Sequence, residues 1–116
     1  MMNKELEHNI QNMVNYIYML APEVRVEHIS VIFGDEDANL KVYPPLTWNE
    51  EQCDELEDKI AEHVVDILVQ AGYLILVGVY TPEEQIAKMR HKLALAQQEQ
   101  AQANHFLAQA AALGLA

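Results

Sequence analysis

The feature that most constrains this chain is a stretch of 32 residues, from Pro82 to Leu113, with no glycine or proline after its first position. Thr81, Pro82 and Glu84 are typical of a helix start: a cap, a proline at the first helical position and a capping-box glutamate. A helix of this length is roughly 48 Å long, whereas a domain of this size is only about 30 Å across. The sequence therefore predicts that residues 82–116 are a C-terminal helix too long for its own domain to bury.

Apolar and small residues recur along this helix at alternating spacings of three and four, which is the period of a coiled coil. Alanines would allow a close approach of two helices, and a glutamine within the stripe could define the register. We expect the helix to be an oligomerisation element and the protein to be a homo-oligomer; the alternative is a frayed tail of alanine and glutamine. The predicted contact positions are Ile86, Met89, Leu93, Ala96, Gln100, Ala103, Leu107 and Ala110.

Residues 1–81 are predicted to form an α+β core domain. A first helix precedes Pro22, which disfavours helical backbone in the residue before it. A strand of β-branched residues then spans residues 24–33, and a short second strand closes a hairpin. The residues that carry these patterns are Leu6, Ile10, Met13, Ile17 and Leu20 in the helix, and Leu40, Val42 and Tyr43 in the second strand.

A second helix follows a capping box at Thr47 and Glu50, and Gly72 lies where a C-cap glycine is expected. The apolar run from Tyr73 to Tyr80 predicts a third strand buried on both faces. The apolar stripe of the second helix consists of Leu56, Ile60, Val64, Ile67, Leu68 and Ala71.

The resulting order is α-β-β-α-β-α, which predicts an α+β fold. We expect a small three-stranded sheet in a shortened ferredoxin-like arrangement, with helices mainly on one face. The crossover helix allows the third strand to lie parallel to one hairpin strand. The expected core contains Ile17, Val31, Val42, Ile60, Val64, Ile75 and Val77.

The net charge of −11 comes from 18 acidic and seven basic residues, and much of it falls on one face of the second helix. Such a field repels phosphate backbones and anionic lipid. We therefore expect no nucleic-acid and no membrane partner, and we expect the acidic face to suit a protein with a basic surface. A small basic patch, Lys88, Arg90 and Lys92, could pair with the acidic helix of a neighbour or of the same molecule. The predicted acidic surface is Glu50, Glu51, Asp54, Glu55, Asp58 and Glu62.

Candidate metal and catalytic residues are few. His63 and Asp66 lie one helical turn apart and could supply two ligands, but a half-buried histidine bonded to Asp66 is the simpler interpretation. We interpret His28 as a rim residue of the sheet. Acidic neighbours make Cys53 a poor nucleophile, so we interpret it as a core residue. The turn from Asp35 to Asn39 starts like a calcium loop, but its later positions fail, so it is a solvated turn.

No motif predicts an enzyme, a cofactor or a metal, so two function classes remain. The first is a non-catalytic assembly or adaptor protein that self-associates through its last helix and presents its acidic surface to a protein partner. The second is a regulatory domain that senses a metal or ligand on a ferredoxin-like sheet. A single cysteine fits a reducing, cytoplasmic location.

Overall fold

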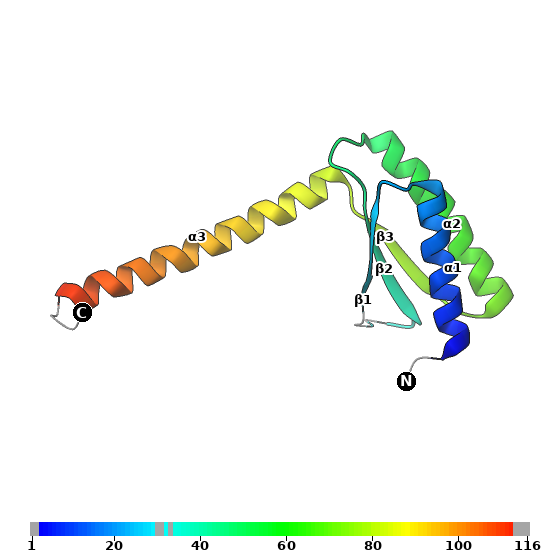
Figure 1. Ribbon diagram of the computed structural model, residues 1–116, viewed down its shortest axis with the longest axis horizontal. Helices are drawn as coiled ribbons and strands as arrows, with labels where there is room; N and C mark the ends of the chain where they lie inside the picture. The colour runs from blue at the N-terminus through cyan, green and yellow to red at the C-terminus, as the bar shows by residue number, and fades with distance from the viewer. Residues whose placement is uncertain (1–2, 30–31, 33, 113–116) are drawn as a thin grey trace. The chain divides into compact units, whose positions relative to one another are not determined.

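The computed structural model describes residues 3–29, 32 and 34–112, with side chains described as far as residue 103. It confirms the predicted fold class: three helices and a three-stranded mixed sheet in the order α-β-β-α-β-α (Figure 1). The chain divides into two compact units, residues 1–83 and 84–116. The elements are α1 (Lys4–Leu20), β1 (Arg25–Ile29), β2 (Ala38–Tyr43), α2 (Glu50–Ala71), β3 (Ile75–Val79) and α3 (Pro82–Ala112).

Helix α1 begins after the N-cap residue Asn3 and ends two residues before Pro22. The side chain of Asn3 accepts hydrogen bonds from the backbone N–H groups of Glu5 (2.7 Å) and Leu6 (3.3 Å), which satisfies donors that the first turn leaves without partners. The helix ends at Leu20, before Pro22, as predicted. Its buried face carries the predicted Ile10, Met13 and Ile17, with Leu6 and Leu20 partly buried.

Strands β1 and β2 form the predicted antiparallel hairpin. Within the described residues, their pairing runs from Arg25 opposite Tyr43 to Ile29 opposite Asn39. Just before β2, the backbone N–H of Asp37 donates to the carbonyl of Leu74 (2.8 Å). This part of the chain therefore bonds to the segment that leads into β3. Of the predicted strand, residues 24–33, the structure shows Arg25–Ile29 as β1, and residues 30, 31 and 33 lie outside the described residues.

Helix α2 connects two neighbouring parallel strands, β2 and β3, as a crossover must. The parallel register runs from Ala38 opposite Ile75 to Val42 opposite Val79. The predicted C-cap is confirmed: Gly72 has a φ of 79°, in the left-handed region that glycine adopts without a Cβ clash.

The capping box of α2 lies two residues later than predicted. Asn49, not Thr47, is the N-cap: its side chain accepts from the N–H of Gln52 (2.8 Å), and the Gln52 side chain accepts from the N–H of Asn49 (2.9 Å). The reason is a turn in which the N–H of Trp48 donates to the carbonyl of Pro45 (3.1 Å). This turn carries the chain past Thr47 before the helix begins.

The core lies between the sheet and the two helices α1 and α2, which cover the same face of the sheet (Figure 1). Alternation along β2 places Ala38, Leu40 and Val42 on this face, and all three are buried. In the predicted core, Ile17, Val42, Ile60 and Ile75 are buried together, Val64 and Val77 are partly buried against them, and Val31 lies outside the described residues.

The prediction that β3 is buried on both faces is wrong. Leu76 is 41 % exposed and Gly78 is exposed, because α1 and α2 both lie on the opposite face of the sheet. On the face of Leu76, the rings of Tyr43 and Tyr80 stack with their centroids 5.4 Å apart. The guanidinium of Arg25 lies 4.2 Å from the centre of the Tyr43 ring. An aromatic and cationic surface therefore takes the place of a second hydrophobic layer.

We predict that Ile60→Ala lowers the free energy of unfolding by about 2–5 kcal/mol, because it leaves a cavity at a site that is 1 % exposed. Urea unfolding measures this loss. Val65→Ala is the matched control on the same helix, since Val65 is 56 % exposed, and it should change the free energy by less than about 0.5 kcal/mol. Equal losses in the two variants would show that this face of α2 is assigned wrongly.

A second prediction concerns Asp37, whose carboxylate accepts a hydrogen bond from the backbone N–H of Leu74 (2.8 Å). Asp37→Ala leaves that partly buried donor without its acceptor, and we expect a loss of about 1–3 kcal/mol in unfolding free energy. Asp35→Ala, at an exposed position in the same turn, is the control and should be nearly neutral. If the two variants are equally stable, the bond contributes nothing to the stability.

The turn from Asp35 to Asn39, which was predicted to be solvated, is only partly solvated, because Glu36 is buried and Asp37 is partly buried.

Candidate functional site

The predicted acidic surface lies on the exposed side of α2. All six predicted residues are exposed. Helix α2 has eight acidic residues and a single basic residue, Lys59, whose ammonium group pairs with Glu55 (3.3 Å) at the surface. Like charges one turn apart repel one another, so a positively charged partner would relieve this repulsion. Four acidic residues at spacings of four, three and four share one side of the helix, and we name them the acidic stripe: Glu51, Glu55, Asp58 and Glu62.

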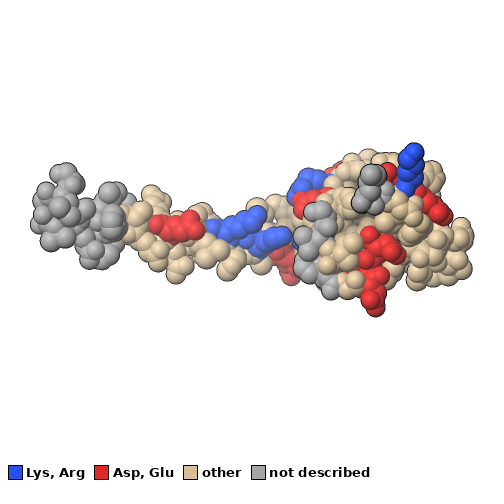
Figure 2. Space-filling view, turned by 90° about the horizontal axis from the view of Figure 1, so that it is seen from below, with Lys and Arg blue, Asp and Glu red and all other residues tan. Residues whose placement is uncertain are grey.

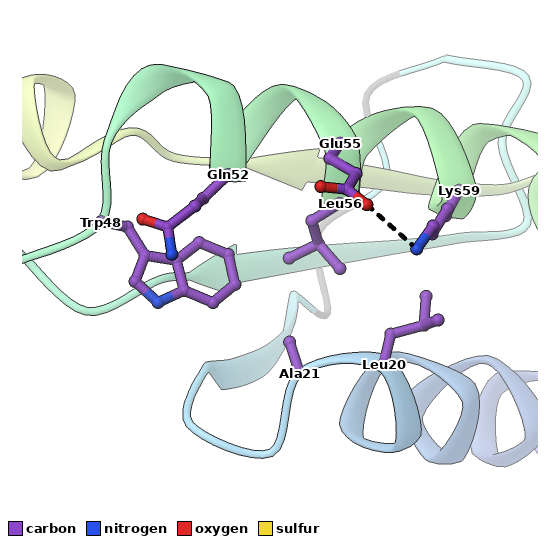
Figure 3. A pocket seen from close by; sticks show the side chains of 7 residues that line it. All are labelled: Leu20, Ala21, Trp48, Gln52, Glu55, Leu56 and Lys59. Carbon is purple, nitrogen blue, oxygen red and sulfur yellow. Dashed lines mark hydrogen bonds and ion pairs between the residues drawn. The ribbon is translucent and has the colours of Figure 1, made fainter.

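A pocket of about 200 Å³ opens at the edge of the acidic stripe, between α2 and the end of α1 (Figure 3). Figure 3 shows the indole of Trp48 beside the Gln52 side chain, while Ala21 and Leu20 approach from the α1 side. The walls are apolar and the rim is polar and charged. The lining residues are Leu20, Ala21, Trp48 and Leu56, with Gln52, Glu55 and Lys59 at the rim.

The pocket follows from local structure at both helix ends. The turn before α2 and its capping box hold Trp48 at the start of the helix. Leu56, one face of which belongs to the core, forms the wall on α2. Opposite it, the chain leaves α1 at Ala21, which has only a methyl group and is 2 % exposed. A small residue between larger ones leaves the space unfilled.

The volume of the pocket limits what it can bind. Sites for small-molecule ligands and cofactors usually occupy about 300–1,000 Å³, so this pocket is small for the ligand-sensing alternative. A cavity of ~150 Å³ can hold a benzene-sized group, and the pocket therefore fits one or two apolar side chains. An apolar pocket with a charged rim is the usual setting of an anchor residue in a protein interface.

The predicted oligomerisation stripe lies on α3, which is continuous from Pro82 to Ala112. Met89 and Leu93 are 50 % and 59 % exposed, and Ile86 is half-buried. Ala96, Gln100 and Ala103 are exposed, while the side chains of Leu107 and Ala110 lie outside the described residues.

Within the described residues, no helix is long and apolar enough to cross a bilayer.

After a first turn that contains Glu83 and Glu84, α3 carries a charge opposite to that of α2. Residues 86–93, which we name the basic segment, contain Lys88, Arg90 and Lys92 and no acidic residue. Figure 2 shows these side chains in blue along one stretch of α3. Ile86, Met89 and Leu93 lie in the same segment at spacings of three and four. The basic segment is therefore an amphipathic helix with a positive charge of three.

The two histidines considered as metal ligands, His28 and His63, lie on different elements, β1 and α2. His63 on α2 is half-buried, as predicted, but its ring stacks on Tyr16 of α1 (centroids 4.0 Å apart) rather than bonding to Asp66. Its buried Nε2 atom has no hydrogen-bond partner among the described residues. His28 is an exposed rim residue of β1, as predicted. In the described part of the chain, no three histidine, cysteine or carboxylate side chains converge on a point that could hold a metal.

Two surfaces were not predicted from the sequence. One is the pocket, and the only feature of the sequence that could have indicated it is the single tryptophan, Trp48, directly before a helix start. The other is an apolar patch on the outer side of α2, formed by Val65, Leu68 and Val69. Leu68 was predicted to belong to the buried stripe, but it is 42 % exposed. Ile67 already fills the core-facing position of that turn, so its neighbour is directed outward. Cys53 is buried in the core side of α2, as predicted.

Comparisons with known proteins give no relatives: no family model, no curated protein and no solved structure matches the chain.

We predict that His63→Phe leaves the stability unchanged or raises it by about 1 kcal/mol. Phenylalanine keeps the stacking contact with Tyr16 and removes a buried nitrogen that lacks a hydrogen bond. His63→Ala removes the ring and should lower the stability by about 1–3 kcal/mol. Urea unfolding of both variants checks this. Equal destabilisation by the two substitutions would mean that the nitrogen makes a bond that the fold requires.

Proposed function

We propose that this chain is a non-catalytic assembly or adaptor protein that self-associates through α3 and presents the acidic surface of α2 to a protein partner. The observation that supports it most is the apolar stripe on α3, where Met89 and Leu93 are half or more exposed in the single chain. Soluble proteins usually cover such residues when they recur along a whole helix, because the recurrence creates a contiguous apolar surface.

The length of α3 supports the same proposal. Isolated helices are only marginally stable in water, and the 31 residues of α3 contain few strongly apolar side chains. Contact with a second helix or another surface would stabilise it. The stripe follows the coiled-coil spacing at eight successive positions. A homo-oligomer is therefore the simplest assembly.

The acidic surface supports the second part of the proposal. Its carboxylates are exposed, and Lys59 is the only basic residue of α2. A field of this sign speeds association with positively charged proteins and opposes binding to nucleic acid or anionic lipid. We place the protein in the cytoplasm, because its one cysteine, Cys53, is buried and no second cysteine exists to form an intrachain disulfide.

We predict that Leu93→Glu weakens self-association at least about tenfold. Burying a leucine contributes roughly 1.5–3 kcal/mol, and about 1.4 kcal/mol corresponds to a factor of ten in the dissociation constant. Sedimentation equilibrium of the full chain at tens of micromolar measures the change.

Leu95→Glu is the matched control: it makes the same change two residues away, off the stripe, at a position that is 46 % exposed. We expect this variant to associate like the unmodified chain. The proposal fails if the unmodified chain is a monomer under these conditions, or if the two glutamate variants are equally impaired.

A further inference from the structure

Two surfaces of this chain are complementary to each other in charge and in apolar character. The pocket presents an apolar interior, and the acidic stripe runs along its α2 edge. The basic segment presents three apolar residues and three bases in two helical turns. These surfaces belong to the two different units of the chain, residues 1–83 and 84–116.

We propose that the basic segment of one copy docks on the acidic stripe and pocket of a second copy, and that the second copy returns the same contact. The inference rests on the proposed self-association through α3 and specifies what the first turns of that helix contact.

The spacing of side chains on the basic segment suits such a contact. In a helix, residues three and four apart share a face, so that Ile86, Met89 and Leu93 form one apolar line. Lys92 flanks this line on one side and Arg90 flanks it on the other. A Met89 or Leu93 side chain fits the volume of the pocket, and the flanking bases would then meet Glu55 at its rim and the other carboxylates of the acidic stripe beyond it. This is the mode in which an apolar helix face enters a groove and charged residues determine its orientation.

Charge favours α2 over a second α3 as the surface that receives the basic segment. If two α3 helices paired in parallel along their whole length, Arg90 would face Gln85 of the other chain and Lys92 would face Gln97, and nothing acidic lies between Gln85 and Gln98. Such a seam would leave both bases without an opposite charge. Against α2, the same bases meet Glu55 and its neighbours on the acidic stripe.

Reciprocity favours a second copy over a foreign partner. One chain carries both surfaces, so two copies can exchange two identical contacts about a two-fold axis. Such an arrangement closes on itself and gives a dimer rather than an open filament.

Charge exchange tests this inference on the full chain. The first variant, Glu55→Arg with Asp58→Arg, reverses the acidic stripe; the second, Arg90→Glu with Lys92→Glu, reverses the basic segment. Each variant by itself brings like charges together, and we expect it to dimerise at least about tenfold more weakly than the unmodified chain. An equal mixture restores opposite charges at both contacts. We expect the mixture to form a heterodimer within about threefold of the original affinity, as measured by sedimentation equilibrium.

Asp54→Arg with Glu57→Arg is the matched control, since it exchanges one aspartate and one glutamate three residues apart on α2, but off the acidic stripe. It should dimerise like the unmodified chain. Trp48 provides a second measurement, because the only tryptophan of the chain lines the pocket. Its fluorescence should shift to shorter wavelength as dimers form and should not do so in either charge-reversed variant alone.

Different results separate the two proposals. If the unmodified chain is a monomer, self-association itself fails and the docking contact fails with it. If it dimerises but the Glu55 and Asp58 variant dimerises equally well, the docking contact is wrong while self-association through α3 stands. Equal weakening by the control variant would also overturn the docking contact. A Trp48 signal that responds to reversal of the basic segment but not to dilution would overturn it in favour of docking within one chain.

Discussion

The fully buried face of β2 is the contact on which the rest of the α+β unit depends. Ala38, Leu40 and Val42 lie at the centre of the sheet, with β1 antiparallel on one side and β3 parallel on the other. The parallel partner requires a crossover, and α2 supplies it. Both α1 and α2 then cover the face that these three residues define. Because the two helices lie side by side on one face, each keeps an outer side in contact with water, and the acidic stripe lies on the outer side of α2.

Helix α2 therefore has two roles that follow from its position. Its inner side carries Leu56, Ile60 and Ile67 into the core, and this packing stabilises the helix despite the repulsion among its carboxylates. By itself, a helix with this many carboxylates would be only marginally stable in water, because like charges one turn apart repel each other. Its N-terminal turns also meet the end of α1, where the small Ala21 leaves the pocket beside Trp48. The pocket thus lies directly next to the acidic stripe, a combination that suits the apolar side chains flanked by bases of the proposed docking contact.

Helix α3 has the reverse composition just after its first turn. Three of the seven basic residues of the chain lie between Ile86 and Leu93, together with the apolar Met89. Further along, alanine and glutamine dominate, with Phe106 and Leu107 as the large apolar residues of the stretch. In the proposed assembly, the basic segment supplies the charged contact, and the rest of α3 adds contacts along its length.

The sequence by itself determined the elements of this protein and their order, because each one depends on short-range rules. Periods of three and four define the faces of α1 and α2, Gly72 and Pro82 mark helix ends through backbone sterics, and the spacing along α3 is visible without any partner. Contacts between distant residues decided the rest. Hydrogen bonds between Asp37 and Leu74 join the start of β2 to the segment before β3, and the placement of both covering helices on one side leaves Leu76 exposed on β3. The pocket exists only because Leu20 and Ala21, at the end of α1, meet Trp48 and Leu56, which are far from them in the sequence. Periodicity shows which side of an element is apolar, but the number and direction of the layers that pack against it decide which apolar side chains are covered.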